Sequence, residues 1–200
     1  MAGAIAIVDS GGANIASLKF AMDRLGYESR LTTDESEIRN AARVILPGVG
    51  AAADAMVRLR EHGLVDVIRD LTQPVLGICL GMQLLADASE EEDVECLGVI
   101  PGIAQKLSVA PGLPVPNMGW CPITRTGSHT VLDTLEDQSY FYFVHSYALP
   151  LSDYTLASAN HSSAFSAVTG RENFVATQFH PERSSIAGAK ILRRFIGDGA

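Results

Sequence analysis

The first 80 residues alternate short apolar runs with segments of helical periodicity, and this alternation limits the possible fold more than any other feature. The runs that indicate strands are residues 4–8, 28–31, 43–46 and the run 74–78 that enters Cys79. The segments that indicate helices are residues 14–25, 34–40, 51–62 and 64–71. Strands separated by helices pair in parallel in a sheet that helices cover on both faces. The sequence predicts an α/β fold with a doubly wound, mostly parallel sheet.

The second half of the chain favours β-strands. We expect strands at 140–147, 154–159 and 174–179, followed by an amphipathic helix at 186–196. Pro47 is expected to end the third strand, because proline has no N–H for the ladder. No repeat, low-complexity tract or linker interrupts the chain. The sequence therefore predicts a single domain of residues 1–200, in which β-hairpin elements are added to the parallel sheet.

Composition excludes several classes of function. The net charge is −8, which argues against binding to nucleic acid, because such proteins cluster Lys and Arg. The three cysteines, at positions 79, 96 and 121, have neither disulfide-framework nor zinc-site spacing, so we predict no metal and no cofactor. No apolar run is long enough for a membrane span, and the N-terminus has no export signal. We expect a cytoplasmic enzyme without membrane partners.

Cys79 lies in a tight connection between a strand and a helix. The segment 77–81 reads GICLG, with glycines two residues before and two residues after the cysteine, and a helical segment at 82–88 follows. This is a cysteine form of the nucleophile elbow, in which a sharp turn exposes the nucleophile at the end of a sheet. A helix that starts beside the sulfur lowers the thiol pKa. The alternative is a buried structural cysteine, which is common in proteins.

A second motif supplies the partners that a nucleophilic cysteine needs. His180 follows the strand 174–179, and Pro181 prevents further ladder pairing, so the histidine stands at the strand end. Glu182 is two residues further along and can reach the imidazole ring. A base that takes the thiol proton and an acid that orients the base complete a triad of Cys79, His180 and Glu182. The alternative for residues 180–182 is a solvated loop.

The two motifs, GICLGMQ at 77–83 and HPE at 180–182, resemble the class I glutamine amidotransferases, which hydrolyse glutamine and pass ammonia to a synthase. The resemblance implies a flavodoxin-like fold. The segments PGVG at 47–50 and MGW at 118–120, with Asp9, Gly11 and Asn14, resemble the glutaminase subunits of imidazole glycerol phosphate synthase within that class. Such a subunit forms a heterodimer with a (βα)₈-barrel cyclase.

The resemblance implies a role for each matching residue. Cys79 would become a glutamyl thioester, while His180, held by Glu182, transfers the protons. The expected oxyanion donors are Val49, Gly50 and Leu80. The expected contacts to the substrate L-glutamine are Gln83, Glu91, Tyr142, His145 and Ser146, although His145 could instead be a hydrogen-bonded strand histidine. The expected contacts to the partner are Asn14, Trp120 and Arg183, although Trp120 could instead lie in the core.

Three other functions remain open at this point. The chain could serve another synthase, such as the one that makes pyridoxal phosphate, but Val49 and the 118–120 segment argue against this. It could be a free-standing Cys–His hydrolase of γ-glutamyl peptides, which would turn over without a partner. It could also be a non-catalytic binding module. Ser10, Asn117, Cys121 and Arg183 depart from the usual pattern of the family, which affects partner contacts more than chemistry.

Overall fold

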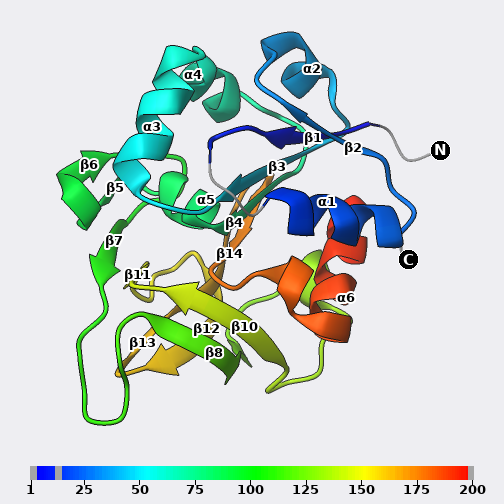
Figure 1. The fold of residues 1–200 in the computed structure, drawn as a ribbon. Helices are drawn as coiled ribbons and strands as arrows, with labels where there is room; N and C mark the ends of the chain where they lie inside the picture. The colour runs from blue at the N-terminus through cyan, green and yellow to red at the C-terminus, as the bar shows by residue number, and fades with distance from the viewer. Residues whose placement is uncertain (1–3, 12–14, 198–200) are drawn as a thin grey trace.

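The computed structural model describes residues 4–11 and 15–197, which contain an eight-stranded sheet of order β2-β1-β3-β4-β14-β13-β12-β9 (Figure 1). Its parallel strands are β1 (Ile5–Val8), β2 (Ser29–Thr32), β3 (Arg43–Gly48), β4 (Val75–Cys79) and β14 (Phe174–Thr177). Its antiparallel strands are β13 (Ser163–Arg171), β12 (Thr155–His161) and β9 (Thr124–Arg125). The predicted doubly wound sheet with added hairpin elements is confirmed.

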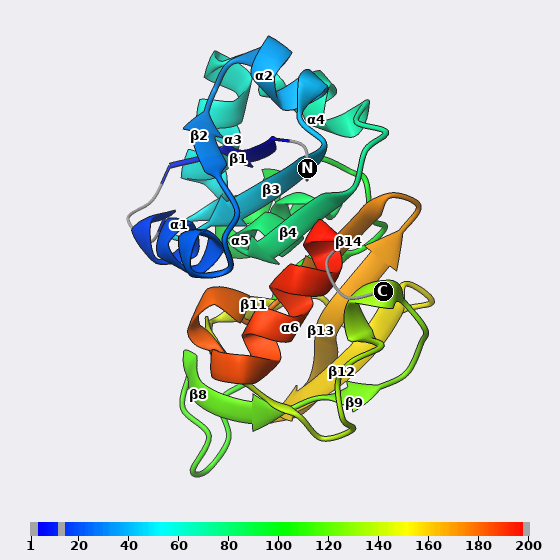
Figure 2. The same ribbon diagram turned by 90° about the vertical axis from the view of Figure 1, so that its right-hand side faces the viewer.

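Helices cover both faces of the parallel strands (Figure 2). One face carries α1 (Ile15–Arg24) and α6 (Ser185–Ile196). The other face carries α2 (Glu35–Asn40), α3 (Ala52–Glu61), α4 (Leu64–Arg69) and α5 (Leu80–Leu84). Alternate residues of β1 belong to opposite cores, because strand side chains point alternately to the two faces. No helix in these described ranges has the length and apolar character needed to cross a bilayer.

Two smaller sheets and several 3₁₀ turns pack around the central sheet. One small sheet pairs β8 (Asn117–Pro122) with β10 (Tyr140–His145), and another joins β11 (Tyr147–Ala148), β7 (Ile103–Lys106), β5 (Ala88–Ser89) and β6 (Val94–Glu95). The 3₁₀ turns are η1 (Glu91–Asp93), η2 (Thr130–Leu132) and η3 (Pro181–Arg183). Phe141 of β10 stacks on Phe179 with ring centroids 4.0 Å apart, and this contact supports the chain just before His180.

Pro47 does not end the third strand, contrary to the prediction. Strand β3 continues to Gly48, and Pro47 and Gly48 pair with Ile78 and Cys79 of β4. On its other edge, β3 pairs with β1 only as far as Ile45. The Pro47 carbonyl points to that second edge, where it accepts a hydrogen bond from Ser10. The missing N–H of Pro47 therefore falls where no ladder bond is required.

The helix after Cys79 also differs from the prediction. It begins at Leu80, directly after the cysteine, and ends at Leu84, whereas the sequence indicated residues 82–88. The shift follows from the turn itself, because Cys79 already takes the non-helical backbone of the residue before a helix. Residues 88–89 form β5 instead. The strand before His180 ends at Thr177, two residues earlier than expected.

We expect Gly81→Ala to destabilise the protein by about 3 kcal/mol, near the upper end of overpacking costs. A Cβ at Gly81 would lie 1.8 Å from the carbonyl oxygen of Leu46, which is backbone of β3 and cannot swing away. Urea unfolding followed by circular dichroism measures the loss. Gly127→Ala is the control, because its nearest contact is the flexible end of the Leu156 side chain at 3.0 Å. Equal stability of the two variants would contradict the tight α5–β3 approach.

Candidate active site

Cys79 sits in a strained turn between β4 and α5. Its backbone has φ 53° and ψ −108°, a region that residues with a Cβ rarely adopt. The flanking glycines make the turn possible, because a Cβ at Gly77 would lie 2.9 Å from Leu85 and one at Gly81 would strike Leu46. The cysteine is 7% exposed and is therefore mostly buried. This geometry is that of a nucleophile elbow.

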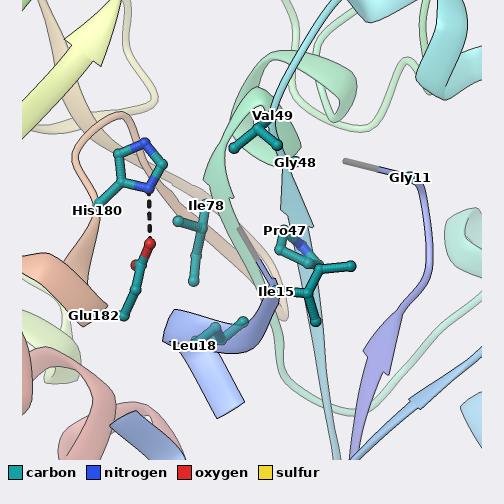
Figure 3. Close-up of a pocket in the computed structure, with 9 residues that line it drawn as sticks. All are labelled: Gly11, Ile15, Leu18, Pro47, Gly48, Val49, Ile78, His180 and Glu182. Atoms are coloured by element: carbon teal, nitrogen blue, oxygen red, sulfur yellow. Dashed lines mark hydrogen bonds and ion pairs between the residues drawn. The ribbon is translucent and has the colours of Figure 1, made fainter. Parts of the chain in front are cut away.

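His180 and Glu182 lie beside this turn. His180 Nδ1 and Glu182 Oε1 are 2.8 Å apart, and the two side chains are only 3% and 4% exposed (Figure 3). Ser184 holds the connecting turn η3, since its hydroxyl donates to the His180 carbonyl and accepts from the Tyr142 N–H. The Nε2 atom of His180 makes no hydrogen bond with the described residues. That nitrogen is free to exchange a proton with Cys79.

The environment of His180 favours the charged imidazolium. Burial of the ring opposes its charge, but interactions with Cys79 and Glu182 outweigh burial and raise the pKa of His180 to about 10. A protonated histidine next to a cysteine stabilises the thiolate, which is the nucleophilic form of the side chain. A cysteine, a histidine and a carboxylate are the residue types that cysteine-based acyl transfer uses.

A pocket of about 430 Å³ opens in front of Cys79. Most of the predicted site residues line this pocket, namely Val49, Gly50, Cys79, Leu80, Gln83, Glu91, His145, Ser146, His180 and Arg183. Pro116, Val144 and Tyr147 complete the lining. These residues come from the ends of parallel strands and from the β-rich insertions. The carboxyl ends of parallel strands are where such folds bind ligands.

Two buried glutamine amides lie near the sulfur, and one of them, Gln83, lines the pocket. Gln83 is 4% exposed, and its Nε2 donates to the Tyr147 carbonyl at 2.9 Å and to Gln178 Oε1 at 3.3 Å. Gln178 in turn places its Nε2 3.7 Å from Cys79 Sγ. Gln178 was not among the predicted site residues. The available signal was a polar amide in the mostly apolar run 174–179, two residues before His180.

Glu91 and His145 each have a structural partner as well as a place in the pocket. Glu91 Oε2 accepts the Ala52 N–H at 3.0 Å and so caps the start of α3. Burial lowers the pKa of His145 to about 4, so its ring is neutral. Its Nδ1–H donates to the Tyr147 carbonyl at 2.9 Å, and its Nε2 accepts from the Asn117 amide at 3.1 Å. The hydrogen-bonded strand histidine that the sequence left open is therefore present, at the edge of the pocket.

Tyr142 lies elsewhere than predicted. Side chains alternate along β10, and the phenol of Tyr142 is on the face away from the core, where it does not line the pocket. Its ring instead meets Trp120 edge-on at 6.1 Å, and the Arg183 guanidinium lies 4.6 Å from its centroid. Trp120 is 50% exposed, which excludes the core position for this residue. Asn14, the third predicted partner contact, lies outside the described residues.

A second, much smaller cavity lies beside the His180–Glu182 pair (Figure 3). Its volume is about 20 Å³, and its walls are formed by Gly11, Ile15, Leu18, Pro47, Gly48, Val49, Ile78, His180 and Glu182. Such a volume holds about one water molecule. Glu182 Oε2 is buried without a hydrogen-bond partner in the described part of the chain. Oε2 of Glu182 can therefore accept a hydrogen bond from such a water, while Oε1 binds the His180 ring.

Comparison with known families gives one match over nearly the whole chain. The family model described as glutamine amidotransferase class-I matches residues 6–198. The imidazole glycerol phosphate synthase subunit HisH of Xanthomonas axonopodis pv. citri (strain 306) is 47% identical over 192 residues, which are 96% of each chain. Subunit HisH 2 of Legionella pneumophila (strain Lens) is 48% identical over the same length and share.

Solved structures show the same fold. A crystal structure of a glutamine amidotransferase superposes with a TM-score of 0.75 at 18% identity, over 96% of this chain and 97% of that chain. A glutamine amidotransferase of Thermotoga maritima superposes with a TM-score of 0.66 at 17% identity, over 98% of this chain and 82% of that chain. At these identities the structures support the fold alone.

We expect Glu182→Gln to lower the pKa of His180, because a neutral amide no longer attracts the imidazolium. A raised pKa stabilises the fold fully below the unfolded-state value of about 6.5. That stabilisation is lost as the pH rises through about 10. The deficit of the variant in free energy of unfolding should therefore shrink between about pH 6 and about pH 10.

Imidazole NMR titration and urea unfolding at several pH values measure these two effects. Glu61→Gln is the matched control, since Glu61 is exposed at the end of α3, and it should leave the His180 titration unchanged. An unaltered pKa in Glu182→Gln would mean that Glu182 does not set the charge state of the histidine.

Proposed function

This chain belongs to the class I glutamine amidotransferase family, and on that premise we propose that it is the glutaminase subunit of an imidazole glycerol phosphate synthase in histidine biosynthesis. It hydrolyses L-glutamine to glutamate and ammonia. The observation that carries the proposal is that the strained Cys79 turn and His180 line one pocket, while buried Glu182 holds the far side of the His180 ring. Service to a pyridoxal phosphate synthase is not favoured, since the relatives at 47–48% identity are named HisH.

The proposed chemistry starts with the thiolate of Cys79. Its sulfur attacks the side-chain amide carbon of glutamine, and the tetrahedral adduct collapses to a glutamyl thioester. His180 gives its proton to the departing nitrogen, which leaves as ammonia, and then takes a proton from the water that hydrolyses the thioester. Glu182 keeps Nε2 of the ring directed at the reaction by binding Nδ1. Each proton transfer passes through Nε2, which makes no hydrogen bond with the residues that the structure describes.

The negatively charged oxygen of the tetrahedral adduct needs hydrogen-bond donors. We assign these to the N–H of Leu80, the first residue of α5, and to the peptide around Val49 and Gly50. Gly48 and Gly50 flank Val49, so the peptide units beside it can rotate easily. One such donor is worth about 2.7–4 kcal/mol in an acyl-transfer site. The orientation of this peptide therefore determines much of the rate.

The remaining lining residues select the ends of the substrate. Glu91 supplies a carboxylate for the α-ammonium group, and Ser146 and Gln83 supply polar atoms around the carboxylate end. His145 shapes the wall there, because both of its ring nitrogens are already hydrogen-bonded. Glu91 can serve the ligand while it caps α3, because one of its oxygens remains available. A pocket of about 430 Å³ leaves room for the whole amino acid.

The ammonia is consumed by a partner, which we take to be a (βα)₈-barrel cyclase in a cytoplasmic heterodimer. The lyase step belongs to that partner, and this chain performs the hydrolysis. The half-exposed Trp120 and the Tyr142–Arg183 pair present aromatic and cationic groups beside the pocket, and such groups commonly anchor interfaces. Tyr142 thus joins the docking surface, together with the Asn14 contact that the sequence suggests.

Cys79→Ala should abolish glutaminase activity while the complex still makes product from supplied ammonia. The sulfur lies inside the pocket, which Trp120 and Tyr142 of the docking surface do not line, so assembly should be unaffected. Glutamate release and ammonia-dependent cyclase turnover are measured on the same reconstituted complex. Loss of the ammonia-dependent reaction would reveal a structural role for Cys79, and retention of glutaminase activity would refute the proposed nucleophile.

Trp120→Ala should weaken binding to the cyclase by about 2 kcal/mol or more, the cost typical of a central aromatic anchor. Isothermal titration calorimetry measures the affinity, and urea unfolding of the free subunit checks its stability. Leu151→Ala is the control, since Leu151 is also 50% exposed but lies in the connection between β11 and β12. Normal affinity together with a less stable free subunit would assign Trp120 a folding role instead.

A further inference from the structure

Ser10 makes a long-range side-chain hydrogen bond just beyond the paired part of β1 and β3. Its side chain is 2% exposed, and its hydroxyl donates to the Pro47 carbonyl at 2.8 Å, across 37 residues of sequence. Strand β1 ends at Val8, and its pairing with β3 stops at Ile45. The Ser10 hydroxyl therefore replaces the ladder bond that the Pro47 carbonyl would have received from a longer β1.

This bond completes the support of β3 at its last residues. On the opposite edge, Gly48 pairs with Cys79, and a Cβ at Gly48 would lie 2.8 Å from Leu80 Cβ. The Pro47–Gly48 peptide is thus held from both sides, by Ser10 and by the elbow. A peptide unit is planar, so a fixed carbonyl also fixes the direction of the following N–H and Cα.

The chain loses this support immediately afterwards. Val49 and Gly50 line the substrate pocket on one side and a second hollow of about 460 Å³ on the other, which is also lined by Ser10, Gly11 and Arg58. Arg58 lies over Gly11 and forms an ion pair with Asp9 at 3.8 Å, which braces the segment that carries Ser10. The segment Val49–Gly50 therefore lies between two open spaces and depends on its anchored start for its position.

We propose that the Ser10 hydroxyl is a positioning group for the oxyanion site, because it holds the Pro47 carbonyl and so directs the peptide units of Val49 and Gly50 toward the adduct. The proposal rests on the proposed glutaminase function and deepens it. Ser10 touches neither the substrate nor the triad. Its effect should appear in the step that builds negative charge on oxygen, not in thiolate formation or in glutamine binding.

Ser10→Ala removes the hydroxyl and leaves the Pro47 carbonyl without its donor. In the complex with the cyclase, we expect kcat for glutamine hydrolysis to fall about tenfold with KM within about twofold, as for a lost hydrogen bond that acts in the transition state. Alkylation of Cys79 by iodoacetamide should proceed at the wild-type rate, because that displacement of iodide forms no oxyanion. Ser29→Ala is the matched control, since Ser29 is buried in β2 and its hydroxyl has no partner among the described residues.

A second pair of variants separates the hydroxyl from packing. Ser10→Thr and Ser10→Val add nearly the same volume, but only threonine keeps the donor. Threonine should retain most of the wild-type kcat, and valine should match Ser10→Ala. This comparison also decides the matter if the alanine variant does not fold.

Several outcomes would overturn the proposal. These are a kcat for Ser10→Ala within twofold of Ser29→Ala, equal kcat for the threonine and valine variants, or an equal loss of kcat and of alkylation rate. Absence of glutaminase activity in the wild-type complex would instead refute the proposed function itself. A wild-type complex that turns over, with no effect of Ser10→Ala, would refute only the role of Ser10.

Discussion

The strained turn at Cys79 is the constraint on which the rest of the site depends. A residue with a Cβ held at positive φ is unfavourable alone and persists only where its surroundings over-determine it. Here β4 is clasped between β3 and β14, and Gly81 brings α5 against the Leu46 carbonyl of β3. The sheet thereby holds Cys79 in its strained backbone conformation, and this conformation keeps the sulfur in the pocket.

The polar groups around the sulfur are buried but only partly satisfied. His180 gives one nitrogen to Glu182 and keeps the other free, and Glu182 keeps one oxygen free beside a cavity that can hold a water. Unpaired buried polar atoms are costly, and in native proteins they often mark functional sites. The burial of the ring is outweighed by hydrogen bonds and charge interactions with Cys79 and Glu182, which raise the pKa of His180.

Strand β10 links this site to the outer surface. Its inward residues Phe141 and Phe143 pack on Phe179 and support the His180 turn, while Tyr142 points outward to Trp120 and Arg183. A partner that binds against Trp120 and Tyr142 would therefore contact β10, the strand that also carries the Val144 carbonyl beside Cys79. The oxyanion segment is supported independently from β1 through Ser10.

The sequence alone determined the elements whose signals are local. The strand–helix alternation predicts the parallel sheet, glycine spacing marks the Cys79 turn, and the i, i+2 spacing places Glu182 against His180. Other features depend on elements distant in sequence. The inward amide of Gln178, the outward ring of Tyr142, the continuation of β3 through Pro47 and the Ser10 bond were decided by register and pairing between strands. Periodicity says which faces a strand has, but only tertiary packing decides what each face meets.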